Sequence, residues 1–156
     1  MPSSNPKDLI GSDKLPLHLW PETATVWGCL ALLDGALKYG RANWRVVGVR
    51  VSIYYDALRR HMNAYIEGED IDPESGLPHL AHALACLALL VDAQATGKIT
   101  DDRHYPGGYL QLVPEATKHV ARLKRLHRKT HRERPKHYTI DDHKRHVLAH
   151  RKFREG

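Results

Sequence analysis

The sequence predicts an all-α fold. Several segments carry apolar residues at helical spacing, one of them is almost purely apolar, and no alternating run is long enough to form a sheet. At 156 residues the chain suits one compact domain with an appendage, and an apolar share of 42% is enough for a core.

The first helix is expected over residues 22–39. Proline and an acid at Pro21 and Glu22 are typical of a helix start, and Gly40 is a natural C-terminal stop. Between them apolar side chains recur at helical spacing, at Val26, Trp27, Leu30, Leu33 and Leu37. Residues 1–20 show little periodicity and are expected to form an extended arm.

The second helix is expected from about Val49 to Glu67, ending at Gly68. Its predicted buried stripe consists of Ile53, Tyr54, Ala57, Leu58, Met62 and Tyr65. Arg60 lies on the polar face together with Asp56 and Glu67, so it suits either a salt bridge or phosphate binding.

The third helix is expected over about 78–96 and is apolar nearly all round, so it should be the central, buried helix. Cys29 and Cys86 form no disulfide framework and are interpreted as core thiols. Residues 103–114 are expected to form a loop, followed by helices at about 115–133 and 140–154.

Charge divides the chain into two parts. From residue 118 onward fourteen Lys and Arg face four Asp and Glu, which makes that segment +10, while the first 117 residues carry ten against fourteen, a net charge of −4. We therefore predict a domain at 1–117 and a basic helical extension at 118–156, here called the basic tail. One basic face of the tail, formed by Lys118, Arg122, Arg125 and Arg132, supports an alternative function as a nucleic-acid-binding protein.

The segment between the second and third helices is the candidate site. It places several carboxylates in a tight turn, after His61 and before His79 and His82, and such groups can hold a divalent metal against a phosphorylated substrate. Glu69 and Asp72 are the chosen carboxylates because Gly68 and Pro73 bracket them, whereas Asp70 and Glu74 are expected to face solvent. The alternatives are solvated loop carboxylates and hydrogen-bonded core histidines.

A second cluster follows the first helix. Lys38, Asn43 and Trp44 offer a cation, an amide and an aromatic ring around a helix end, although the same run also suits a capped helix with Trp44 packed in the core. The N-terminus lacks the apolar segment of a secretory signal and no apolar run would cross a membrane, so we expect a cytoplasmic protein without membrane contact.

Taken in order, these motifs resemble the phage dATP/dGTP diphosphohydrolase family. The motifs that carry the resemblance lie within about residues 5–100, and they are Gly11–Leu17, Gly35–Gly40, Asn43–Arg45, Arg60–His61, Gly68–Gly76 and His79–His82. The resemblance implies a MazG-like helical bundle that acts as a homo-oligomer, a dimer or a tetramer. It also implies cleavage of dGTP or dATP to the monophosphate and diphosphate, in phage nucleotide-pool remodelling or 2-aminoadenine DNA synthesis in the host cytoplasm.

The implied site has three parts. Metal ligands are expected at Glu69, Asp72, His79 and His82. Related enzymes use two acidic pairs, and the two histidines in place of one pair make Mn²⁺ or Co²⁺ as suitable as Mg²⁺. Catalytic roles are expected for Glu69, Asp72, His82 and Arg60. The substrate is expected to meet Lys14, Lys38, Asn43, Trp44, Arg60 and His61. The basic tail lies outside the resemblance and is expected to make at most weak, non-specific nucleic-acid contacts.

Overall fold

The computed structural model describes the chain except for residues 1–4, 6, 8–9, 12, 131–134 and 147–156. It divides into two compact units, Met1–Arg103 and His104–Gly156. The first unit contains the 3₁₀ helix η1 (Leu17–Leu19), the helices α2 (Glu22–Tyr39), α3 (Asn43–Val47), α4 (Val51–Ile66) and α5 (His79–Ala95), and the strands β1 (Val49–Arg50) and β2 (Ile99–Thr100). The all-α prediction is confirmed.

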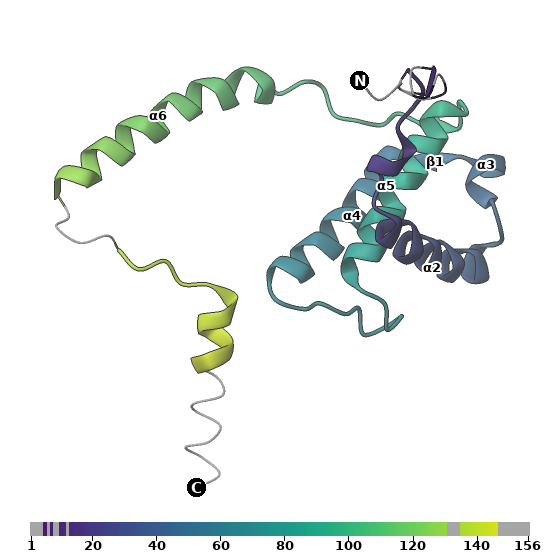
Figure 1. Cartoon of the computed structure of the whole chain (residues 1–156), viewed down its shortest axis with the longest axis horizontal. Coiled ribbons are helices and arrows are strands. Elements are labelled where there is room, and N and C mark those ends of the chain that lie inside the picture. Colours follow the sequence, from purple (N-terminus) through teal and green to yellow (C-terminus); the bar gives the residue numbers. More distant parts are fainter. Residues whose placement is uncertain (1–4, 6, 8–9, 12, 131–134, 147–156) are drawn as a thin grey trace, which may run out of the picture. The chain divides into compact units, whose positions relative to one another are not determined.

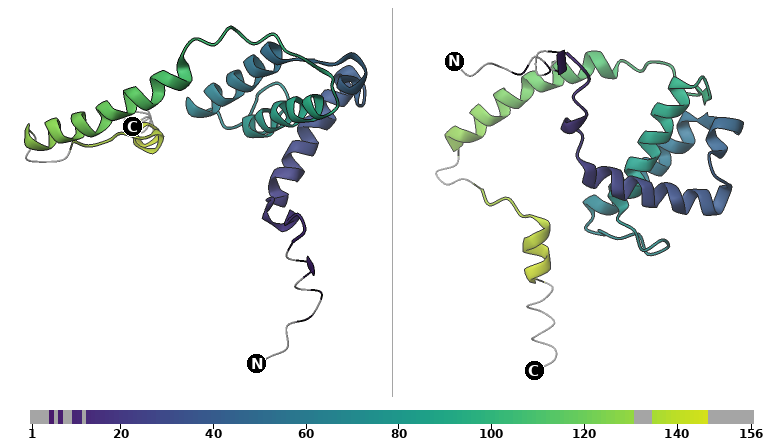
Figure 2. Two further views of the ribbon diagram at one scale, coloured as in Figure 1. Left: turned by 90° about the horizontal axis from the view of Figure 1, so that it is seen from above. Right: turned by 45° about the vertical axis from the view of Figure 1, so that its right-hand side comes forward.

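The three long helices begin and end close to where their patterns predict. α2 has the predicted bounds, α5 is one residue shorter at each end, and α4 begins two residues later than expected because Val49 and Arg50 form β1. α5 packs against both α2 and α4, and Figures 1 and 2 show α4 and α5 running side by side. The prediction of a central third helix is therefore confirmed. It is not buried all round, however, because Leu80, Leu87 and Val91 are 45%, 47% and 67% exposed.

The core is built from small residues. α5 buries Ala81, Ala83, Ala85 and Ala93, and α2 buries Gly28 and Ala31. A Cβ atom at Gly28 would lie 3.3 Å from Leu84, so the absence of a side chain allows α2 and α5 to approach closely.

The predictions of burial for Ile53 and Cys29 are wrong. The apolar stripe of α2, whose spacing predicted the helix, is also exposed, with exposed fractions of 59% at Val26, 53% at Leu33 and 80% at Leu37. On α4, Ile53 is 58% exposed, and Cys29 on α2 is exposed too. The spacing correctly predicts a helix but not its packed face, because α2 packs its small residues against α5 and exposes its large apolar ones.

A short parallel pairing of β1 with β2 was not predicted, because two residues are too few for a strand pattern. Val49 lies opposite Ile99, and the Val49 N–H donates to the Lys98 carbonyl at 2.8 Å. Val49 is only 1% exposed, so the pair closes the end of the core beyond α4 and α5.

The second unit contains α6 (Tyr109–Thr130) and a helical segment at 140–146. The predicted loop over 103–114 is therefore wrong from residue 109 onward, where α6 begins. Pro114 does not prevent the helix, because it lies near the helix start and its missing N–H removes only one helical hydrogen bond. Arg132 and the end of the second predicted tail helix lie outside the described residues. None of the described helices is long and apolar enough to span a bilayer.

Candidate functional site

A cavity of about 380 Å³ lies among α2, α4, α5 and the loop between α4 and α5. Its size is within the range of small-molecule sites. Seven residues predicted for the site line it, namely Lys38, Asn43, Trp44, Arg60, His61, Asp72 and His82. Three others, Lys14, Glu69 and His79, do not.

The loop that carries the acidic residues has a defined backbone. The Asp72 N–H donates to the Leu77 carbonyl at 2.9 Å, and the Gly76 N–H returns to the Asp72 carbonyl at 2.8 Å. Gly76 has φ +72°, a conformation that favours glycine. The His79 N–H donates to the Asp70 carbonyl at 3.0 Å and so ties the loop to the start of α5. The turn therefore fixes Asp72 at one end of the cavity.

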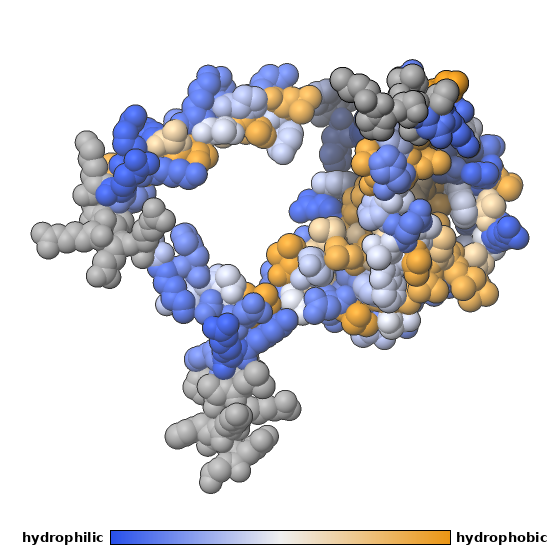
Figure 3. Space-filling view, viewed as in Figure 1, coloured by the Kyte–Doolittle hydropathy of each residue, from blue (hydrophilic) through white to orange (hydrophobic). Residues whose placement is uncertain are grey.

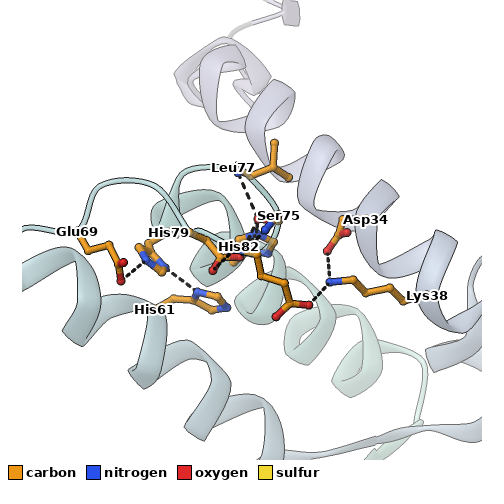
Figure 4. Close-up of polar contacts among 10 residues, drawn as sticks. Asp34, Lys38, His61, Glu69, Ser75, Leu77, His79 and His82 are labelled. Carbon is orange, nitrogen blue, oxygen red and sulfur yellow. Dashed lines mark hydrogen bonds and ion pairs between the residues drawn. The ribbon is translucent and has the colours of Figure 1, made fainter.

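Asp72 and His82 meet through Ser75 (Figure 4). The Ser75 hydroxyl lies 2.7 Å from both Asp72 Oδ2 and His82 Nε2, and Asp72 is also 3.5 Å from the imidazole. An ionised carboxylate only accepts, so the hydroxyl donates to Asp72 and accepts from His82 Nε2–H. Burial by itself would raise the pKa of Asp72, but hydrogen bonds from the Ser75 hydroxyl and the Glu74 and Ser75 N–H groups outweigh it and lower the pKa.

Glu69, His79 and His61 form a second chain of contacts. His79 is 5% exposed, with Nε2 3.2 Å from Glu69 Oε2 and Nδ1 2.9 Å from His61 Nδ1. For neutral rings, His79 donates to Glu69 through Nε2–H, so His61 Nδ1–H must donate to His79, which leaves His61 Nε2 as an acceptor.

His61 also lies against His82. The two rings stack with centroids 4.7 Å apart and planes 15° apart. Burial, followed by the neighbouring His82 and His79, lowers the pKa of His61, because a charged ring is disfavoured there. The structure thus brings together three histidines that lie on two different helices.

Lys38 is held between two carboxylates. Its Nζ lies 3.0 Å from Asp34 Oδ2, one turn earlier on α2, and 3.1 Å from Glu74 Oε1 in the loop. Hydrogen bonds to Asp34 and Glu74 raise the pKa of Lys38, so the ammonium remains charged. Glu74 is 78% exposed, as expected, but it also lines the cavity and binds Lys38, which its sequence position did not predict.

The remaining predicted residues lie in different settings. Trp44 is half-buried, and its indole N–H donates to Asp92 Oδ2 at 2.6 Å, so it lines the cavity with one edge anchored on α5. Arg60 lines the cavity, and no ion pair joins it to Asp56 or Glu67 within the described part of the chain. Lys14 is exposed in the N-terminal arm.

Sequence reasoning missed Asp34, Tyr54 and Cys86 as cavity residues. For Asp34 a signal existed, since it precedes Lys38 by one helical turn. Tyr54 and Cys86 lie in apolar helical patterns, which predict core positions. Across the described residues, no group of three or more histidine, cysteine or acidic side chains is arranged so that it alone could hold a metal ion.

Comparisons with known proteins agree with the motif order. The profile of the dATP/dGTP diphosphohydrolase N-terminal family matches residues 4–103, which include every lining residue of the cavity. A dATP/dGTP diphosphohydrolase of Salmonella phage PMBT28 is 34% identical over 112 residues. That alignment covers 66% of this chain and 38% of the phage protein, so the chain spans well under half of its relative. No solved structure matches the chain.

Proposed function

The chain belongs to the dATP/dGTP diphosphohydrolase family through residues 4–103, and we propose that it hydrolyses dATP and dGTP to the monophosphate and diphosphate. The carrying observation is the cavity itself, whose lining combines charged and histidine side chains with aromatic and apolar ones. A nucleotide has the same division between its phosphates and its base. We propose that its role is nucleotide-pool remodelling, including the supply of nucleotides for 2-aminoadenine DNA synthesis. We also propose that it acts in the cytoplasm, where deoxynucleotides are used.

The charged side chains supply the contacts that phosphates need. Lys38 and Arg60 both line the cavity and carry positive charge toward the triphosphate. Lys38 is already positioned by Asp34 and Glu74, so little side-chain freedom is lost when a phosphate arrives. This arrangement favours charge stabilisation of the departing diphosphate.

The donor set fits a divalent metal that enters with the triphosphate and not one held in a closed protein cage. Mg²⁺ commonly binds one or two carboxylates together with substrate phosphates, and the cavity offers the Asp72 carboxylate beside the His82 imidazole. We therefore narrow the proposed ligands to Asp72 and His82, because Glu69 and His79 bind each other outside the cavity lining. With the Nε2–H of His82 donating to Ser75, the nitrogen of His82 that keeps a lone pair for a metal is Nδ1. Mg²⁺, Mn²⁺ or Co²⁺ would neutralise phosphate charge and lower the pKa of a bound water.

His61 is the residue best placed to accept a proton. Its Nε2 is left as an acceptor by the hydrogen-bond chain through His79 to Glu69. A water oxygen attacks the α-phosphorus, the bond from that phosphorus to the β-bridging oxygen breaks, and the water proton passes to His61 Nε2. Glu69 stabilises the resulting imidazolium through His79. This scheme gives Glu69 and His79 a role behind the cavity wall.

The proposal is tested by product analysis. Incubation with each deoxynucleoside triphosphate and Mg²⁺, Mn²⁺ or Co²⁺ should yield equal amounts of monophosphate and diphosphate from dATP and dGTP, with no product after chelation of the metal. Chromatography separates monophosphate, diphosphate, orthophosphate and triphosphate. Release of orthophosphate, or of intact triphosphate, would contradict attack at the α-phosphorus.

We further propose that the chain acts as a dimer or tetramer through α2. Val26, Leu30, Leu33 and Leu37 follow a 4-3-4 spacing along its outer face, with exposed fractions from 39% to 80%. Figure 3 shows apolar side chains exposed on this part of the surface. A second copy offers the same stripe, so the two faces can cover each other. Leu30→Glu with Leu33→Glu should lower the mass measured by light scattering to that of one chain.

The basic tail supports a second candidate function, weak nucleic-acid contact. On α6 the cations Lys118, Arg122 and Arg125 lie at i, i+4 and i+7, opposite an exposed apolar stripe that includes Val120 and Leu123. Figure 3 shows this separation along the helix. Contacts of such a face with phosphates would be non-specific and salt-dependent.

A truncation separates the two functions. A chain ending at Arg103 keeps every cavity residue, so we expect it to retain kcat/KM within a few-fold while losing DNA and RNA binding. In the full chain, Arg122→Glu with Arg125→Glu should weaken binding and flatten its dependence on salt. Fluorescence anisotropy at several salt concentrations measures this. A folded but inactive truncated chain would place part of the chemistry in residues 104–156.

A further inference from the structure

The cavity has two ends about two helical turns apart. On α4, Tyr54 precedes His61 by seven residues, which is roughly 10 Å along the helix axis. On α5, Cys86 and Leu89 lie one and two turns beyond His82. His61 stacks on His82 at one end, and all three of Tyr54, Cys86 and Leu89 line the cavity away from them. The distance suits a nucleotide with its phosphates by the histidines and its base by Tyr54.

The cavity has room for a flat ring. Its walls on α2, α4 and α5 carry small residues, including Ala31, Gly35, Ala57 and Ala85. A Cβ atom built at Gly35 would meet no atom within 4 Å, so space remains beside α2. Tyr39 and Trp44 also line the cavity and supply aromatic surface for a base.

Tyr54 brings an uncommitted polar group to this end. The hydrogen bonds found among the described residues do not involve its hydroxyl, and the side chain is partly buried. Burial, followed by the proximity of Cys86 and Tyr39, raises the pKa of Tyr54, so the hydroxyl keeps its proton. A phenolic hydroxyl can donate or accept a hydrogen bond as its proton rotates.

We infer that Tyr54 is the residue that reads position 6 of the purine base, and that its hydroxyl accommodates both adenine and guanine. Adenine carries an amino donor at this position and guanine a carbonyl acceptor. An ionised carboxylate can only accept a hydrogen bond, so it would bind the amino group of adenine but not the carbonyl of guanine. The hydroxyl can accept from the amino group and can also donate to the carbonyl. The inference rests on the proposed function, and it explains tolerance of two purines by a single side chain.

The test removes the hydroxyl from the protein and the 6-substituent from the substrate. Wild type should turn over dATP and dGTP with kcat/KM about three- to tenfold above that of the triphosphate of 2′-deoxynebularine, which lacks the substituent. Tyr54→Phe should bring all three values together. Tyr55→Phe, the neighbouring and 49% exposed tyrosine outside the cavity lining, should behave as wild type.

A binding measurement separates failure of this inference from failure of the proposed function. Calorimetry with α,β-methylene analogues of the same three triphosphates needs no turnover, and the same pattern of dissociation constants is expected. Wild type that binds these analogues with the predicted pattern but hydrolyses nothing would refute the proposed reaction alone. Unchanged ratios in Tyr54→Phe, or no binding of any purine analogue, would overturn the assignment of Tyr54.

Discussion

Asp72→Asn should lower kcat/KM for dATP and dGTP by about 10²- to 10³-fold while the helical content stays unchanged. Asp72 supplies a carboxylate that the turn, Ser75 and His82 all position at the cavity. The Glu74 N–H donates to Asp72 Oδ1 and the Ser75 N–H to Oδ2, so asparagine, with one acceptor oxygen, keeps one of these hydrogen bonds and removes the negative charge. Steady-state kinetics and circular dichroism measure the two effects.

The matched control is Ser75→Ala. It removes the hydroxyl that joins Asp72 to His82 but leaves the carboxylate and the imidazole in place. We expect a smaller loss, about tenfold, because only the positioning of the pair is weakened. His82→Ala should resemble Asp72→Asn. Full activity in His82→Ala would make His82 a structural histidine, and full activity in Asp72→Asn would remove the proposed ligand pair.

The sequence predicted the helices of the first unit well because their ends carry strong local signals. Pro21, Gly40 and Gly68 bound α2 and α4 within a few residues, and the apolar run of α5 had to lie at the centre. The face of α2 that packs inward was not predictable in the same way. Apolar residues mark both of its sides, and close packing on α5 selected the side with Gly28 and Ala31.

The candidate site was predicted as a set of residues but not as an arrangement. The position of His82 one turn after His79 suggested one shared ligand group, yet His79 turns to Glu69 and His61 whereas His82 turns to Ser75 and the cavity. That division depends on how α4 packs against α5, which spacing along one helix does not specify. Tyr54 was overlooked for the same reason, since an aromatic residue in an apolar stripe gives no sign that it lines a cavity.

Gly48 is the backbone position where a substitution should cost the most stability. It has φ +87° and ψ 178°, a region that essentially only glycine occupies. A Cβ atom there would lie 2.8 Å from the Lys98 carbonyl oxygen, and backbone atoms cannot move aside as a side chain can. The same carbonyl accepts the Val49 N–H at 2.8 Å, so relief of the clash would open the pairing of β1 with β2.

We therefore expect Gly48→Ala to lower the free energy of unfolding by about 3–4 kcal/mol, and Tm by roughly 10 °C or more. Gly40→Ala is the matched control: Gly40 has φ +93°, but a Cβ atom there would meet nothing within 4 Å. It should cost only the conformational strain, about 1–2 kcal/mol. Thermal and urea unfolding of both variants measure the difference, which isolates the contact with Lys98. Equal losses in the two variants would mean that β1 and β2 can separate without cost, and that Val49 does not depend on their pairing for its burial.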